Sequence, residues 1–372
     1  LAMMAVLWAL LAFGISDFDT WFDSGLHKLV DGFSGLMEED KRHFLEETLL
    51  HHLGKTAEIL FFLLGAMTIV EIIDYFDGFA TFKNYIQTRK RKKLLWIFAA
   101  LAFILSAIID NLTATIVLIT ILQKIIPDRN SRLWFAGLIV IAANAGGAWS
   151  PIGDVTTTML WIGKKVTTIN LIKFLILPSL VCMVIPVYIA SFMKPFKGKI
   201  AKPVEDNTEV NPHGSKMLYL GLSSIIFVPI FKTITHLPPY VGMMLSLSVV
   251  GIFAEIYSRS QFSISNVVSD EHHDHVGGHS PVHKSLSRIE MPSILFFFGI
   301  LMAVAALESL GLLFIGAEQL KTVIPNTDVV VMLLGVGSAV VDNVPLVAAS
   351  MGMFQDTIDS PLWHFVAYSA GT

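Results

Sequence analysis

The sequence predicts an all-α polytopic membrane protein with an inverted-topology repeat, two re-entrant helical hairpins and broken helices. Hydrophobic residues make up 54% of the chain and charged residues only 15%, whereas a soluble domain carries about a quarter charged residues. The apolar residues come in blocks that reach the ~20 residues needed to cross a bilayer. Two of these blocks carry polar residues at their middle, and motifs of the first half recur in the second.

The apolar blocks predict a series of membrane spans in chain order. They lie at 1–16, 57–80, 134–163, 168–193, 216–232, 239–258 and 291–314, and another begins near 361. Residues 17–56 are polar and amphipathic, so we expect an external surface loop with a helix pair. Residues 259–290 form a polar loop that is rich in histidine.

Two further apolar stretches, 94–127 and 327–356, predict re-entrant hairpins rather than simple spans. Each carries Asp-Asn at its middle, as Asp110-Asn111 and Asp342-Asn343. A charged residue at the bilayer centre costs about 2.5–3.5 kcal/mol, and an irregular turn is tolerated there only when it is buried in protein or lines a wet cavity. Each stretch is long enough for two short helices with the polar pair at the turn.

The two halves of the chain repeat each other. The segment starting Ile59-Leu-Phe-Phe recurs as Ile294-Leu-Phe-Phe, and the Asp-Asn pairs and an Ala-Gly pair follow in the same order. We divide the chain into a first repeat at 1–193, a cytoplasmic linker at 194–215 and a second repeat at 216–372. The basic run 88–93 is expected in the cytoplasm by the positive-inside rule. The odd number of spans between the hairpins makes the second hairpin enter from the other side, as in many secondary transporters.

A motif rich in glycine and oxygen side chains interrupts the span 134–163. Gly146, Gly147, Pro151 and Gly153 are poor residues for a continuous helix and predict a broken one. The freed carbonyls and half-helix ends of such a break can face an ion. Hard cations prefer oxygen ligands, and the motif supplies several. They are Asn144, Ser150, Asp154 and Thr156.

The second half supplies Ser338, Asp342 and Asn343 at its hairpin, and its own broken helix is expected to begin at 370–372. Because the chain starts with Leu1 and stops inside this motif, we expect a fragment of a longer protein, truncated at both ends. Each aspartate has a simpler reading as a helix cap. Asn144 and Thr156 could serve only in helix packing.

These motifs resemble the NhaD-type sodium/proton antiporters of the ion transporter superfamily, which also holds arsenite permeases and dicarboxylate carriers. The resemblance implies Na⁺(Li⁺)/H⁺ antiport by an elevator-type movement, with cation and proton competing for buried aspartates. It implies no cofactor beyond the transported Na⁺ or Li⁺ and H⁺, and no catalytic residue. The positions that match the family's cation-binding residues are Asp110, Asn111, Asn144, Asp154, Thr156, Ser338, Asp342 and Asn343.

Other functions remain as alternatives at this stage. A carrier for arsenite or a dicarboxylate is the nearest, although dicarboxylate recognition favours Arg or Lys and the motifs contain neither. An intramembrane aspartyl protease is a more distant one, because its paired aspartates give no role to the repeat. A passive channel is a third.

Two further features allow two interpretations each. Glu308, late in the span 291–314, is either a proton relay or an interfacial residue. The histidine tract at 271–283 is either a metal- or pH-sensing loop or only a polar one.

Composition also limits the partners and the compartment. The single cysteine, Cys182, excludes a disulfide framework, and the short, scattered basic segments give no sign of nucleic-acid binding. The expected partners are the lipid bilayer and small monovalent cations. A homodimer is an option, because elevator-type carriers are often dimers. The expected location is the cell inner membrane, with an organellar membrane as the alternative.

Overall fold

The computed structural model describes residues 1–23, 28–30, 32–82, 86, 88–200, 211–265, 280–338, 340 and 342–371. These residues are almost entirely helical. The only sheet among them is one antiparallel pair of two-residue strands, β1 (Phe22–Asp23) and β2 (Lys28–Leu29). The structure therefore confirms the predicted all-α class.

The first half forms most of its helices where apolar blocks predict them. In chain order these are α1 (Ala2–Gly14), α2 (Glu38–Tyr75), α4 (Arg91–Ser106), α5 (Asn111–Ile125), α6 (Arg129–Gly147), α7 (Val155–Ile162) and α8 (Thr168–Ala190). Short 3₁₀ turns lie at Ile15–Asp17, Phe33–Gly35, Gly78–Ala80 and Lys194–Phe196. The interruption between α4 and α5 falls at Asp110, and the one between α6 and α7 ends at Asp154.

The second half follows the same order of elements after two long helices. Its helices are α9 (Gly214–Thr235), α10 (Pro239–Ser265), α11 (Pro281–Arg288), α12 (Met291–Ser309), α13 (Leu312–Val323), α14 (Thr327–Ser338), α15 (Asn343–Met353) and α16 (Pro361–Gly371). The interruption between α14 and α15 lies at Asp342, which caps α15.

Among the described residues, five helices are long and apolar enough to cross a membrane: α2, α8, α9, the 239–258 part of α10, and α12. Large apolar side chains of α8, such as Phe174, Leu177 and Ile185, are exposed. A soluble monomer rarely exposes a continuous apolar face of this kind, whereas lipid would cover it. The chain is a polytopic membrane protein.

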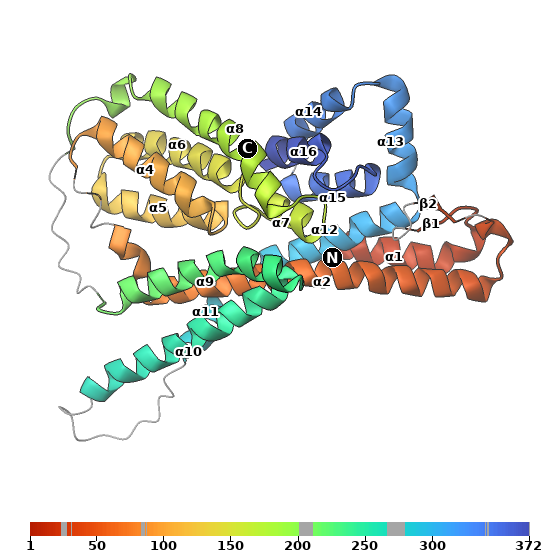
Figure 1. The fold of residues 1–372 in the computed structure, drawn as a ribbon, viewed down its shortest axis with the longest axis horizontal. Coiled ribbons are helices and arrows are strands. Elements are labelled where there is room, and N and C mark those ends of the chain that lie inside the picture. Colours follow the sequence, from red (N-terminus) through yellow and green to blue (C-terminus); the bar gives the residue numbers. More distant parts are fainter. Residues whose placement is uncertain are drawn as a thin grey trace.

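The helices form a lower layer and two groups above it (Figure 1). A lower layer contains α1, α2, α9 and α12, with α10 slanting away from it, and α4–α8 and α13–α16 lie above this layer on the left and right. The α16 helix bridges the upper groups because it packs against α7 and α8 as well as α14. The basic run 88–93 contacts the start of the linker 194–215, where Arg91 Nη1 donates to the carbonyl of Pro195 (3.0 Å).

The polar segment 17–56 is not only an external loop, which corrects the sequence prediction. From Glu38 onward it is the first half of α2, a single helix of 38 residues that is about 57 Å long. The polarity of residues 38–56 suggested a separate surface element. Helix-favouring residues continue into the apolar part, and the helix runs through Gly54 without a break.

The span predicted at 291–314 also ends earlier. The α12 helix stops at Ser309, because Gly311 takes a left-handed conformation (φ 69°) that terminates it and starts α13. The α13 helix was not predicted. The loop expected at 259–290 is also partly helical. The α10 helix runs to Ser265, and α11 contains His283. The other histidines of the tract lie outside the described residues.

Gly146 and Gly147 serve close packing rather than the break itself. Both are in the last turn of α6, which stays helical to Gly147. A Cβ atom added at Gly146 would lie 2.3 Å from the carbonyl oxygen of Phe103 on α4, and one at Gly153 would lie 2.4 Å from that of Ser106. These glycines therefore let the end of α4 touch the interrupted helix directly.

Candidate functional site

Asp110 lies at the turn between α4 and α5 and caps α5. Its Oδ2 accepts hydrogen bonds from Thr113 N and Thr113 Oγ1, both at 3.0 Å. Aspartate suits this position because the first amides of a helix lack partners within the helix. The capping interaction fixes the carboxylate at the amino end of α5.

The next residue ties this turn to α6. Asn111 Nδ2 donates to Asn144 Oδ1 at 3.1 Å. Both side chains are half-buried. Two of the predicted site residues, separated by 33 positions, therefore meet directly, and each amide keeps further hydrogen-bonding capacity.

Asp154 caps α7 and is deeply buried. Its exposed fraction is 5%, and that of Thr156 is 0%. Thr156 Oγ1 donates to Asp154 Oδ2 at 2.6 Å, while Thr156 N lies 3.5 Å from Oδ1. The carboxylate therefore sits at the amino end of α7 with one strong hydrogen bond from a neighbouring hydroxyl.

Two threonine side chains bond the backbone of the break. Thr157 Oγ1 donates to the carbonyls of Ser150 (2.7 Å) and Asp154 (2.9 Å), and Thr158 Oγ1 donates to that of Pro151 (3.0 Å). These hydrogen bonds help to hold the irregular segment in shape and satisfy three of its carbonyls.

A cavity joins Asp110 to Asp154. Thr113, Thr158, Glu290, Ser293 and apolar side chains complete its lining, which includes no lysine or arginine. A second cavity of about 310 Å³ also borders Asp110 and is lined by the acidic side chains of Glu71, Asp74 and Glu290 and by Lys124. The sequence analysis did not single out Glu71, Asp74 or Glu290 as site residues. Only the fold brings them to this passage.

The second half places its residues at the equivalent turn, in different surroundings. Asp342 Oδ1 accepts from Val344 N (2.9 Å) and the side chain is exposed, while Ser338 Oγ donates to the carbonyl of Gly335 (2.7 Å). Asn343 is half-buried beside them. Within the described residues, no hydrogen bond links Ser338, Asp342 or Asn343 to the first-half cluster.

One element of the second half does reach Asp154. A Cβ atom added at Gly371, the last residue of α16, would lie 3.1 Å from Asp154 Oδ2 and 3.4 Å from Thr156 Oγ1. The expected start of the second broken helix therefore packs against the first break. The Ala-Gly pair at 370–371 was a sequence signal for this approach.

The polar side chains of this site are carboxylates, amides and hydroxyls. Across the described ranges no group of three or more His, Cys, Asp or Glu side chains converges as a multivalent metal would require. Asp110 and Asp154 contribute two carboxylates, and amides and hydroxyls surround them. Hard oxygen ligands of this kind suit an ion such as Na⁺.

Comparison with known proteins identifies the family. The model of a citrate transporter family, CitMHS, matches residues 1–371. The chain belongs to this family. The chain is similar to "Sodium/proton antiporter 1" of Arabidopsis thaliana, 43% identical over 87% of the chain and 55% of that protein. "Sodium/proton antiporter 2" of the same plant is 39% identical, with 87% and 76% covered.

A bacterial relative gives the same indication. The "Na(+)/H(+) antiporter NhaD" of Vibrio parahaemolyticus is 30% identical over 94% of the chain and 86% of its own length. The chain spans about half of the first plant relative and most of the other two. The matches confirm that this CitMHS member resembles NhaD-type antiporters, as the motifs indicate.

Glu308 lies apart from this cluster in the CitMHS member. It is half-buried near the end of α12 and lines a third cavity, beyond the other end of α7, with His52, Lys55 and Lys165. The α7 helix separates this cavity from the one that holds Asp154, because Asp154 caps one end of α7 and Gly163 the other. A direct proton transfer between Glu308 and Asp154 has no support in this arrangement.

Proposed function

We propose that this protein is a secondary active transporter, not an enzyme, that exchanges Na⁺ or Li⁺ for H⁺ at the cluster formed by Asp110, Asn111, Asn144, Asp154 and Thr156. The observation that carries the proposal is the burial of Asp154 in a cavity lined by acidic but no basic side chains. A buried carboxylate without a cationic partner is strongly unfavourable unless it binds a cation or a proton.

This requirement provides the coupling. A sodium ion and a proton each neutralise the carboxylate of Asp154, but both cannot occupy the same oxygen atoms. Release of one therefore favours binding of the other, which is the condition for exchange. The names of the plant and bacterial relatives support the same ion pair.

We further propose that Ser338, Asp342 and Asn343 complete the site in another conformation. The exposed position of Asp342 leaves it free to approach the cluster, and α16 already joins the two halves at Asp154. An elevator-type movement would carry the upper helix groups along the lower layer. The expected homodimer is not part of this proposal, because the exposed apolar faces suit lipid as well as a second copy.

Citrate, the substrate in the family's description, fits this site poorly. A tricarboxylate needs positive partners such as arginine or lysine, and the cavity that joins Asp110 and Asp154 has none in its lining. Glu308 as a proton relay also has less support than the aspartate cluster, because it lines a separate cavity.

The test is cation-driven proton movement in everted membrane vesicles loaded with a pH-sensitive dye. Asparagine is as good a helix cap as aspartate, so Asp154→Asn and Asp110→Asn remove the charge but keep the capping acceptor. We expect each to lower the Na⁺-dependent or Li⁺-dependent signal at least about tenfold, because the compensating charge for the ion is lost.

Asp128 provides the matched control. It caps α6 in the same way, accepting from Ser131 N at 2.8 Å, but it is exposed and lies outside the cavity. Asp128→Asn should keep the signal within about twofold. Wild-type vesicles without any Na⁺- or Li⁺-dependent proton movement at neutral or alkaline pH would refute the proposal.

A further inference from the structure

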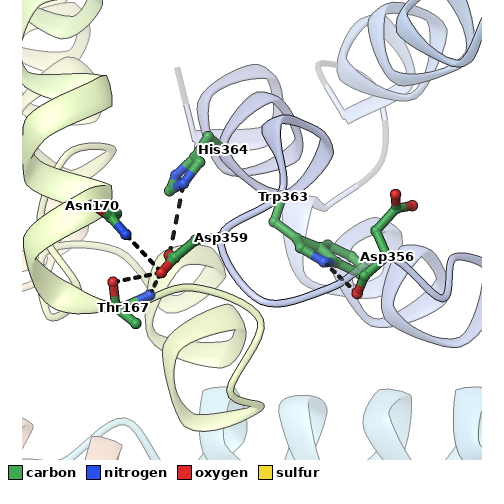
Figure 2. Close-up of polar contacts among 6 residues, drawn as sticks. All are labelled: Thr167, Asn170, Asp356, Asp359, Trp363 and His364. Carbon is green, nitrogen blue, oxygen red and sulfur yellow. Dashed lines mark hydrogen bonds and ion pairs between the residues drawn. The ribbon is translucent and has the colours of Figure 1, made fainter.

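Asp359 connects the two halves of the molecule at a point distant from the ion site. It lies in the loop between α15 and α16, and its side chain is 17% exposed. Thr167 N donates to its Oδ1 (2.7 Å), and Thr167 Oγ1 and Asn170 Nδ2 donate to its Oδ2 (both 2.8 Å). Figure 2 shows these contacts converging on one carboxylate. The imidazole of His364 lies on its other side, with Nε2 3.8 Å from Asp359 Oδ1.

The backbone strengthens the same junction. Asp359 N donates to the carbonyl of Lys165 at 2.9 Å, and Asp359 adopts a left-handed conformation (φ 60°) just before the helix begins at Pro361. Aspartate tolerates this conformation better than most residues. Trp363, fully buried one turn later, donates from Nε1 to the carbonyl of Asp356 (3.2 Å) and lies under the ammonium of Lys165.

The carboxylate of Asp359 remains ionised in this setting. Burial acts to raise its pKa, but the hydrogen bonds from Thr167 and Asn170 outweigh this and hold the pKa below its usual value. Every near neighbour of its two oxygens is a donor. A neutral amide in its place would turn an NH₂ group toward donors and lose at least one of these bonds.

The α16 helix carries this fixed point to the ion site. It starts at Pro361, two residues after Asp359, and ends at Gly371 against Asp154 and Thr156. The distance along the helix is about 15 Å. Because α16 packs against α7 and α8, a shift of its first turn would move its far end relative to the carboxylate of Asp154.

We propose that Asp359 is a positioning residue: its contacts with Thr167 and Asn170 fix α16 so that the end of this helix packs against Asp154 and sets the cation affinity of the site. The inference rests on the proposed function, since the affinity concerns the same ion. Asp359 itself does not touch the ion.

The experiment compares Asp359→Asn with wild type in the vesicle assay, at a series of Na⁺ concentrations. We expect the Na⁺ concentration for half-maximal signal to rise about tenfold, with a smaller change in the maximal signal, because the site loses its geometry rather than its ligands. Asp356→Asn is the matched control in the same loop, since its exposed side chain makes none of these contacts and only its backbone oxygen binds Trp363. It should stay within about twofold of wild type.

A double-mutant cycle tests the specific contact. Thr167→Val removes one donor and should raise the half-maximal Na⁺ concentration about threefold. Adding Thr167→Val to Asp359→Asn should raise that concentration little further, because the effects of mutations at two residues in direct contact are not additive. Thr167→Val also covers the case in which Asp359→Asn does not fold.

Unchanged half-maximal concentrations in both variants, or strictly additive effects, would overturn the inference. Loss of folded protein with an unchanged half-maximal concentration would also overturn it, by showing a merely structural role. A wild-type protein without cation-driven proton movement would instead overturn the proposed function.

Discussion

The two interrupted regions of this protein share a motif but differ in their surroundings. In the first half, Asp110 and Asp154 line one cavity, and Asp154 is 5% exposed. In the second half, Asp342 caps its helix in the same way but is exposed. The shared aspartate therefore explains the start of a half-helix in both places, whereas only burial makes the carboxylate depend on a bound cation or proton.

Burial within the protein is the difference. The protein itself must supply the compensation for a buried carboxylate, by a bound cation or proton, whereas it encloses no such site around an exposed one. The first half is buried because glycines allow α4 to pack directly on α6 and on the break. We therefore expect changes in the packing and polar contacts of the first break to have larger effects than equivalent changes in the second.

The largest effect is expected from the packing itself. Gly146→Ala would place a Cβ atom 2.3 Å from the carbonyl oxygen of Phe103, so α4 and α6 must separate. We expect a loss of stability of about 3 kcal/mol or more, and loss of transport with it. The measurement is thermal unfolding of the purified protein in detergent.

Gly137 is the control for that experiment. It lies in the same helix, and a Cβ atom there meets no neighbour. Gly137→Ala should be neutral or stabilise the protein by up to about 1 kcal/mol. Equal thermal stability of the Gly146→Ala and Gly137→Ala variants would contradict the close approach of α4 and α6.

A moderate effect is expected from the hydroxyl that touches Asp154. Thr156→Val removes the 2.6 Å hydrogen bond to the carboxylate, and hydrogen bonds to charged groups contribute about 1.5–3 kcal/mol. We expect the Na⁺ concentration for half-maximal antiport to change about tenfold or more. Thr157→Val, whose hydroxyl bonds only backbone carbonyls, should alter thermal stability while leaving that concentration within about threefold. The reverse pattern would contradict the assignment.

The smallest effect is expected in the second half. Ser338 bonds only to the carbonyl of Gly335 in its own helix in this conformation and would reach the ion only in the other conformation proposed above, so Ser338→Ala should raise the half-maximal Na⁺ concentration about threefold. A change as large as that of Thr156→Val, in the same vesicle assay, would show that the two breaks contribute equally to binding.

The sequence alone was sufficient for the membrane class and for the turns at Asp110, Asp154 and Asp342, because apolar blocks and capping aspartates are local signals. Long-range features were not predictable in this way. The polarity of residues 38–56 concealed the continuity of α2, and Gly146 was interpreted as a helix breaker although its role depends on α4. Asp359 offered only a weak turn signal in Asp359-Ser-Pro361, since its partners lie 189 and 192 positions away.

The most direct test of the central claim is equilibrium binding of radioactive sodium to the purified protein as a function of pH. If sodium and protons compete for the buried carboxylate of Asp154, wild-type binding should weaken as the pH falls, because protons then occupy the site. Binding to Asp154→Asn should be at least about tenfold weaker, while Asp128→Asn should match wild type. Sodium binding to Asp154→Asn with the wild-type affinity and the wild-type pH dependence would contradict the claim.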